Sequence, residues 1–405
     1  MTGRQGCGVV ETIDRDLKSM PCDPVPPRAR DALLFTPGPL TTSLSVKQAM
    51  LHDVGSWHSD FNAVVAGVRE QLLTLAGLSR DAGWEVVLLQ GSGTFGVEAV
   101  FQTCVPPHGK VIVLANGAYG ERIVQMLEHA RIGHQVLRTQ EDTPGDPAAL
   151  DAALTADPSV THVAVVHCET TTGILNPIRA IGAIAKRHGK VFVVDAMSSF
   201  GGLPIDCAAC GVDFLISSAN KCIEGVPGFS FVFARRELLL GSAGWARSLS
   251  LDLLDQLRGF EKNGQFRYTP PTHVLLAFAQ ALLELKAEGG VAARHERYRR
   301  NHATLMTGMA RLRFAPYLDP SVQSPIITAF RYPTPDFDFT RFYSALSERG
   351  FIIYPGKLTQ VDTFRIGTIG RLFPSDIEQL VAAIETVAGA AGNAGGSHRP
   401  ANPAP

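Results

Sequence analysis

An aspartate and a lysine that each follow a short apolar segment are the two residues of this chain with the clearest chemical potential. Asp195 comes directly after residues 191–194, and Lys221 follows residues 214–216 and a short polar stretch. A lysine amine can form a Schiff base with an aldehyde cofactor such as pyridoxal 5′-phosphate (PLP), and a carboxylate can keep the nitrogen of its pyridine ring protonated. Taken singly, Asp195 would be a helix cap and Lys221 a solvated loop residue. The PLP interpretation therefore requires a phosphate site and a substrate-binding group elsewhere in the chain.

A glycine-rich segment supplies the candidate phosphate site. A predicted strand at residues 85–89 is followed by residues 91–96, Gly-Ser-Gly-Thr-Phe-Gly, and then by a predicted helix from Val97. This order aims backbone N–H groups and a helix N-terminus at an anion. The same segment fits the G-x-G-x-x-G pattern of dinucleotide-binding proteins, so an NAD-dependent oxidoreductase is an alternative. An NAD site would have an acidic residue after the next strand, where this chain has Ala115 and Asn116.

Further polar residues follow other predicted strands. Tyr119 lies in a predicted loop after the strand at residues 111–114, where its ring could stack on a flat cofactor or pack on its own helix. The strand at residues 161–166 ends in a polar cluster, residues 167–173, that includes Thr170. Ligands of open α/β sheets bind at the carboxyl ends of the strands. We therefore expect these residues to share one site.

The alternation of strands and helices predicts an α/β fold. A mostly parallel sheet flanked by helices is expected in a large domain, residues 33–290, and a small α+β domain in residues 291–388. Residues 1–32 are interpreted as a weakly ordered extension. Residues 389–405, rich in Gly, Ala and Pro, are interpreted as a disordered tail.

The composition is that of an ordinary globular protein. The 405 residues carry a net charge of −1, without long runs of one sign, so neither nucleic acid nor an anionic membrane is indicated as a partner. No apolar run approaches the roughly 18 residues of a membrane span, and no secretion signal is recognised, so a cytoplasmic location is expected. Cys207 and Cys210 form a C-x-x-C pair, but no second pair supports a metal site.

Several motifs together resemble the class V aminotransferases of PLP fold type I. The matching segments are residues 36–39 (Thr-Pro-Gly-Pro), 92–94 (Ser-Gly-Thr), 116–122, 167–173, 195–201, 220–222 (Asn-Lys-Cys) and 364–367 (Phe-Arg-Ile-Gly). Within that class, residues 169–173, 219–222 and 268–273 are most similar to the subfamily that transfers the amino group of 2-aminoethylphosphonate to pyruvate. Alanine– or serine–glyoxylate aminotransferases of the same class are the alternative.

This resemblance implies a role for each matching residue. Lys221 would bind PLP covalently and catalyse proton transfer, and Asp195 would pair with the pyridine nitrogen. Arg365 would bind the acidic group of each substrate, and Gly38 would also contribute to substrate binding. The remaining implied cofactor contacts are the phosphate ligands Ser92, Gly93 and Thr94, the stacking ring of Tyr119, the Thr170 contact with the phenolic oxygen, and Thr269, reaching the phosphate from the neighbouring subunit of a homodimer. No metal is implied.

Overall fold

The computed structural model describes residues 31–394, and residues 1–30 and 395–405 lie outside the described part. The compact unit of the structure begins at Leu33. Nearly all of the predicted N-terminal extension therefore lies outside the described residues.

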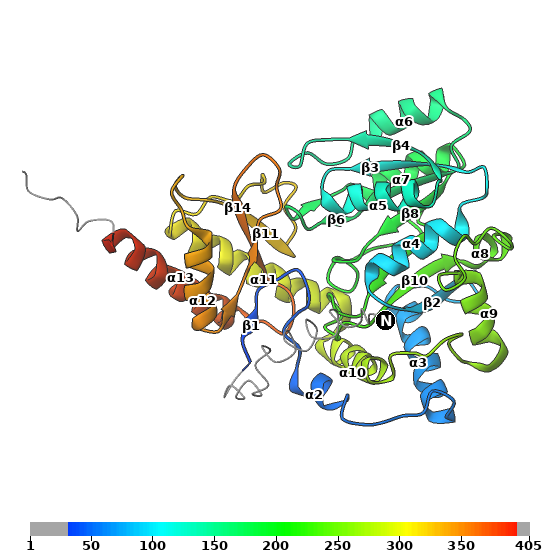
Figure 1. The fold of residues 1–405 in the computed structure, drawn as a ribbon, viewed down its shortest axis with the longest axis horizontal. Coiled ribbons are helices and arrows are strands. Elements are labelled where there is room, and N and C mark those ends of the chain that lie inside the picture. The colour runs from blue at the N-terminus through cyan, green and yellow to red at the C-terminus, as the bar shows by residue number, and fades with distance from the viewer. Residues whose placement is uncertain (1–30, 395–405) are drawn as a thin grey trace, which may run out of the picture. The chain divides into compact units, whose positions relative to one another are not determined.

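A seven-stranded sheet forms the centre of this unit (Figure 1). Its strands, in spatial order, are β2 (Trp84–Gln90), β10 (Phe229–Arg235), β9 (Phe214–Ser218), β8 (Val191–Asp195), β5 (His162–Val166), β3 (Lys110–Ala115) and β4 (Gly133–Arg138). All pairings in this sheet are parallel except the two that β10 makes. The short runs of Val, Ile, Leu and Phe that predicted these strands are buried, as expected for strands covered on both faces.

Helices cover this sheet and complete its core. α4 (Gly93–Cys104) packs on β9 and β10, α5 (Ala118–His129) on β3 and β4, and α7 (Ile178–Arg187) on β5 and β8. α3 (Ser59–Leu75) packs on β2 and on α10 (Thr272–Glu288). One hydrophobic cluster extends through these elements, and within it the ring of Phe278 from α10 packs edge-on against Phe229 of β10.

The C-terminal elements surround a second hydrophobic cluster. They are α11 (Gly290–Arg311), β11 (Ile327–Arg331), α12 (Phe339–Glu348), β12 (Phe351–Ile352), β13 (Tyr354–Pro355), β14 (Thr363–Gly367) and α13 (Pro374–Ala394). Phe364 lies at the centre of this cluster among several other aromatic rings. β1 (Leu33–Leu34) pairs with β12, so Phe35 is buried in this cluster rather than in the first one. The division into domains at residue 290 stays a prediction.

Some predicted elements differ from those observed. α4 begins at Gly93 rather than at Val97, with Ser92 as its N-cap. The first N–H groups of a helix have no intrahelical partner, so the glycine-rich segment can form the first turn of this helix. Tyr119 lies in the first turn of α5, not in a loop. α13 continues to Ala394, past the predicted start of the tail. The short elements that were not predicted are β1, α2 (Leu44–Gln48), β6 (Cys168–Glu169), β7 (Ile174–Leu175), α8 (Arg236–Gly241) and α9 (Leu253–Asn263). α6 (Pro147–Ala156) follows β4.

Neither membrane helices nor metal clusters are found in the described part of the chain. None of the helices in residues 31–394 is long and apolar enough to cross a membrane. The same residues contain no group of three or more His, Cys, Asp and Glu side chains that could hold a metal ion. Cys207 and Cys210 are buried free thiols.

Candidate active site

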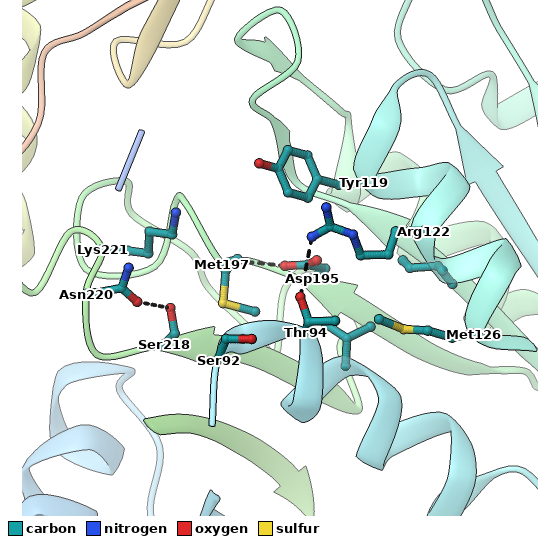
Figure 2. A pocket seen from close by; sticks show the side chains of 13 residues that line it. Ser92, Thr94, Tyr119, Arg122, Met126, Asp195, Met197, Ser218, Asn220 and Lys221 are labelled. Atoms are coloured by element: carbon teal, nitrogen blue, oxygen red, sulfur yellow. Dashed lines mark hydrogen bonds between the residues drawn. The ribbon is translucent and has the colours of Figure 1, made fainter. Parts of the chain in front are cut away.

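A pocket at the carboxyl ends of the sheet strands collects most of the predicted site residues (Figure 2). Its walls come from the segments that follow β2, β3, β8 and β9. The predicted residues that line it are Ser92, Gly93, Thr94, Tyr119, Asp195 and Lys221. Arg122, Met126, Met197, Ser218 and Asn220 also line it, although the sequence analysis gave them no role.

The Lys221 side chain is half-buried, and its amine is held by the segment that contains Gly38. Lys221 Nζ donates a hydrogen bond to the carbonyl oxygen of Pro37 over 2.8 Å. Gly38 has a φ of +128°, and a Cβ added there would lie 2.6 Å from Lys221 Nζ. Glycine is therefore required at position 38 on both backbone and steric grounds. Burial lowers the pKa of Lys221, which makes the neutral, proton-accepting amine more accessible.

A buried network from α11 fixes the segment around Lys221. Glu224 accepts hydrogen bonds from Arg297 Nη2 and from the Tyr298 hydroxyl, over 2.6 and 2.7 Å. Arg294 Nη1 donates to the carbonyl of the residue that follows Lys221, over 2.6 Å. The sequence analysis missed this network, which joins the lysine to a helix more than 70 residues further along the chain.

Asp195 ends β8 with its carboxylate in the pocket. Its Oδ1 accepts a hydrogen bond from the backbone N–H of Met197 over 2.8 Å. Burial raises the pKa of Asp195 to about 6, while the positive charges of Lys221 and Arg122 act in the opposite direction. A buried carboxylate of this kind is stabilised by a cationic partner, which the protonated nitrogen of a pyridine ring would supply.

This raised pKa predicts that Asp195→Asn stabilises the cofactor-free protein above pH 6. In the folded protein the pKa of this carboxyl is about 6, whereas its ordinary pKa is 3.8. The carboxyl therefore keeps its proton up to about pH 6 when the protein is folded. Folding stability therefore falls as the pH rises from about 4 to 6 and stays lower above that range, by about 3 kcal/mol at most. Asparagine retains the acceptor for Met197 N–H without the charge. Denaturant unfolding at pH 5 and pH 8 measures the effect, and an Asn variant less stable than the wild type at pH 8 would contradict it.

The N-terminus of α4 lies in the same pocket and has the donor groups that an anion site would need. Ser92 is the N-cap but makes no side-chain capping hydrogen bond, so its hydroxyl remains available. Arg122 Nη1 lies 3.4 Å from Thr94 Oγ1, which brings a guanidinium to the helix terminus. A Cβ on Gly93 would lie 2.1 Å from the sulfur of Met197, so a larger residue here would displace the Met197 side chain. Backbone N–H groups, hydroxyls and a guanidinium together suit a phosphate.

Glu169 positions Tyr119 at one wall of the pocket. Its Oε2 accepts hydrogen bonds from the backbone N–H groups of Tyr119 and Gly120, over 3.0 and 3.2 Å. The side chain of the buried Thr170 is close enough to the Tyr119 hydroxyl to lower its pKa. In Figure 2 that hydroxyl points toward the side of the pocket from which Lys221 comes. Glu169 was part of the predicted polar cluster, but no role was predicted for it.

Arg365 lies beside this wall rather than in the lining of the Lys221 pocket. Its guanidinium is buried and donates from Nε to the carbonyl of Pro355 over 2.9 Å, and from Nη1 to the carbonyl of Thr170 over 2.8 Å. Burial lowers the pKa of Arg365. Thr170 is thus next to both Arg365 and Tyr119. The Arg365 guanidinium therefore lies near the Tyr119 wall of the pocket, where a substrate anion is expected.

Thr269 is not brought into the pocket. Its side chain is exposed, and its carbonyl accepts a hydrogen bond from Gln90 Nε2 over 3.1 Å. It lies in a separate surface pocket that residues 265–270 and Ser56 line. Its predicted role at the site of a neighbouring subunit stays a prediction.

The family model of the class V aminotransferases matches residues 44–364, and the chain belongs to this family. The chain is 54% identical over 361 residues to the 2-aminoethylphosphonate–pyruvate transaminase of Salmonella typhimurium, which covers 88% of this chain and 98% of the relative. Among solved structures, it superposes on an alanine–glyoxylate aminotransferase from Nostoc sp. with a TM-score of 0.82 and 23% identity, covering 90% of this chain and 97% of the other. It superposes on pyridoxamine–pyruvate aminotransferase from Mesorhizobium loti with a TM-score of 0.79 and 25% identity, covering 92% and 95%.

These comparisons distinguish a PLP-dependent aminotransferase from an NAD-dependent oxidoreductase. The chain has the α/β architecture of PLP fold type I and is an aminotransferase, as the sequence predicted. The alternative of an NAD-dependent oxidoreductase is wrong. The glycine-rich segment that suggested it is the start of α4 in the pocket of Lys221 and Asp195.

Proposed function

We propose that this chain is a PLP-dependent 2-aminoethylphosphonate–pyruvate transaminase, which converts 2-aminoethylphosphonate and pyruvate into phosphonoacetaldehyde and L-alanine. The observation that carries the proposal is the convergence of the Lys221 amine, the buried Asp195 carboxylate and the N-terminus of α4 in one pocket. A transaminase with this substrate pair in its name is 54% identical across nearly the whole of its length, which supports the choice of substrates.

The pocket fits PLP in charge and in donor chemistry. Ser92, Gly93 and Thr94 would hold the phosphate, Asp195 the pyridine nitrogen, and Lys221 the aldehyde carbon. Tyr119 would contact the ring and Thr170 its phenolic oxygen. When bound, PLP supplies an electron-accepting ring that stabilises negative charge on the substrate carbon.

Lys221 would act as the proton-transfer group of both half-reactions. Its Nζ would take the proton from the carbon of 2-aminoethylphosphonate that bears the amino group and pass it to the cofactor side. In the second half-reaction it would deliver a proton to the carbon of pyruvate that becomes the α-carbon of alanine. This role needs an amine that is neutral for part of the time near pH 7, which the pKa lowered by burial provides. The Pro37 carbonyl accepts a hydrogen bond from Nζ and so holds the amine on the Gly38 side of the pocket.

Arg365 would bind the phosphonate of one substrate and the carboxylate of the other. Both groups are anions that can present two oxygens side by side, which match a guanidinium fork. The carbonyls of Pro355 and Thr170 fix the orientation of this fork before the substrate arrives. One arginine can therefore serve both half-reactions.

A homodimer in the cytoplasm completes the proposal. Large apolar side chains are exposed before α3 and before α10, among them Leu51, Trp57 and Tyr268, as is common on surfaces that associate. The same region carries Thr269, for which a role across subunits is predicted. The five cysteines of the described residues are free thiols, which is compatible with a reducing compartment. Light scattering of the purified protein tests the dimer.

A panel of amino donors tests the proposed substrates. We expect the holoenzyme to form alanine from pyruvate with 2-aminoethylphosphonate as the donor, at a far higher kcat/KM than with serine. Alanine with glyoxylate as the acceptor should react slowly. Preferred turnover of alanine or serine with glyoxylate would instead assign the chain to the other class V activity and refute the phosphonate assignment.

A further inference from the structure

Lys357 is a second positive charge beside the proposed substrate anion site. It lies in the segment after β13, and its Nζ is 5.3 Å from the centre of the Tyr119 ring. Its side chain is exposed, and within residues 31–394 no carboxylate forms an ion pair with it. The charge of Lys357 is therefore available to a ligand.

Backbone contacts hold the segment of Lys357 in place. The N–H of Gly356 donates to the carbonyl of Thr363 over 2.9 Å, and a Cβ on Gly356 would lie 2.3 Å from that oxygen. On the other side, the N–H of Thr359 donates to Glu141 Oε2 over 3.2 Å. Lys357 thus lies between two anchored residues, which limits the positions its amine can reach.

The same segment is joined to Arg365. β13 pairs with β14 so that Tyr354 lies opposite Arg365, and the next carbonyl, that of Pro355, accepts the Arg365 Nε hydrogen bond. The Tyr119 hydroxyl and the Arg365 guanidinium are close enough that each shifts the pKa of the other, while the Tyr119 ring lies near Lys357. Lys221, Lys357 and Arg365 all lower the pKa of the Tyr119 hydroxyl, against the raising effect of its burial. A guanidinium and an ammonium therefore flank one tyrosine at the mouth of the site.

We propose that Lys357 determines the preference for the phosphonate substrate by binding its second negative charge, while Arg365 binds the charge that phosphonate and carboxylate have in common. A carboxylate carries one negative charge, and one guanidinium is enough for it. A fully ionised phosphonate carries two, and a flexible ammonium acts as a point charge for the additional oxygen. This inference rests on the proposed function, because it assigns the selectivity of the same site.

Binding of two small anions to the holoenzyme tests the inference without turnover. Methylphosphonate and acetate are titrated by calorimetry at about pH 8, where the phosphonate is largely doubly ionised. We expect Lys357→Gln to weaken methylphosphonate binding about five- to tenfold and to change acetate binding less than about twofold. Lys357→Arg should restore most of the phosphonate affinity, because it keeps the charge.

Kinetics and a control variant complete the test. Lys357→Gln should raise the KM for 2-aminoethylphosphonate while the kcat and the KM for pyruvate stay unchanged. Lys262→Gln, which removes a positive charge from the surface of α9, should change none of these values. Equal weakening of both anions, or of neither, in Lys357→Gln would overturn the inference. Failure of the wild type to use 2-aminoethylphosphonate would refute the proposed function instead, and the two binding constants would still decide the role of Lys357.

Discussion

Lys221→Ala is expected to lower transamination by about 10⁴-fold or more, because it removes the group that moves the proton in both half-reactions. The variant should also lose the visible absorbance band of a cofactor linked to lysine. Folding should be preserved, because burial already disfavours the charged amine of Lys221 and alanine removes that cost. Steady-state kinetics and an absorbance scan of the purified variant measure both effects.

The surface lysine Lys262 provides the matched control for this variant. Lys262→Ala on α9 should keep full activity and the absorbance band. The Lys221→Ala variant should unfold at a temperature no lower than the wild-type apoprotein. Substantial turnover by a folded Lys221→Ala protein would refute the assigned proton transfer.

Arg365→Ala is expected to raise the KM of both 2-aminoethylphosphonate and pyruvate by about 30-fold or more. Removing one partner of a buried charged pair typically costs about 2–5 kcal/mol, and about 2 kcal/mol corresponds to this factor. The absorbance band should remain, because Arg365 hydrogen-bonds to the carbonyls of Pro355 and Thr170, whereas Lys221 hydrogen-bonds to Pro37 and Asp195 to Met197. Initial-rate kinetics with each substrate varied in turn measure the two KM values.

Two variants separate substrate binding by Arg365 from its structural contacts. Arg365→Lys keeps a charge but cannot donate in a fork to the carbonyls of Pro355 and Thr170, so an intermediate KM is expected. Arg331→Ala, on the exposed end of β11, should leave both KM values unchanged. Unchanged KM values in Arg365→Ala would contradict the assignment of the substrate anion site.

Local sequence patterns were sufficient to predict the central sheet and much of the pocket. Buried apolar runs such as residues 191–194 end where the strand ends, so Asp195 could be assigned to the carboxyl edge of the sheet. α9 could have been found as well. Asp252 caps its N-terminus through Asp255 N–H, and Gly264 ends it in the left-handed conformation.

Other parts depend on contacts between distant segments, which a local pattern does not reveal. Tyr119 is helical because its N–H is held by Glu169, 50 residues away. β1 joins the C-terminal elements because it pairs with β12, more than 300 residues further on. Lys357 reaches the Tyr119 ring because its segment is anchored at Glu141. In each case the sequence contains the residue but not the identity of its partner.

The covalent attachment of the coenzyme at Lys221 can be measured directly. Protein purified with PLP is reduced with borohydride, digested and mapped by mass spectrometry. The peptide that contains Lys221 should carry the mass of a reduced pyridoxyl phosphate group, and the same peptide from protein stripped of cofactor should not. An unmodified Lys221, or a modification found on a different lysine, would contradict the assignment of this pocket as the catalytic centre.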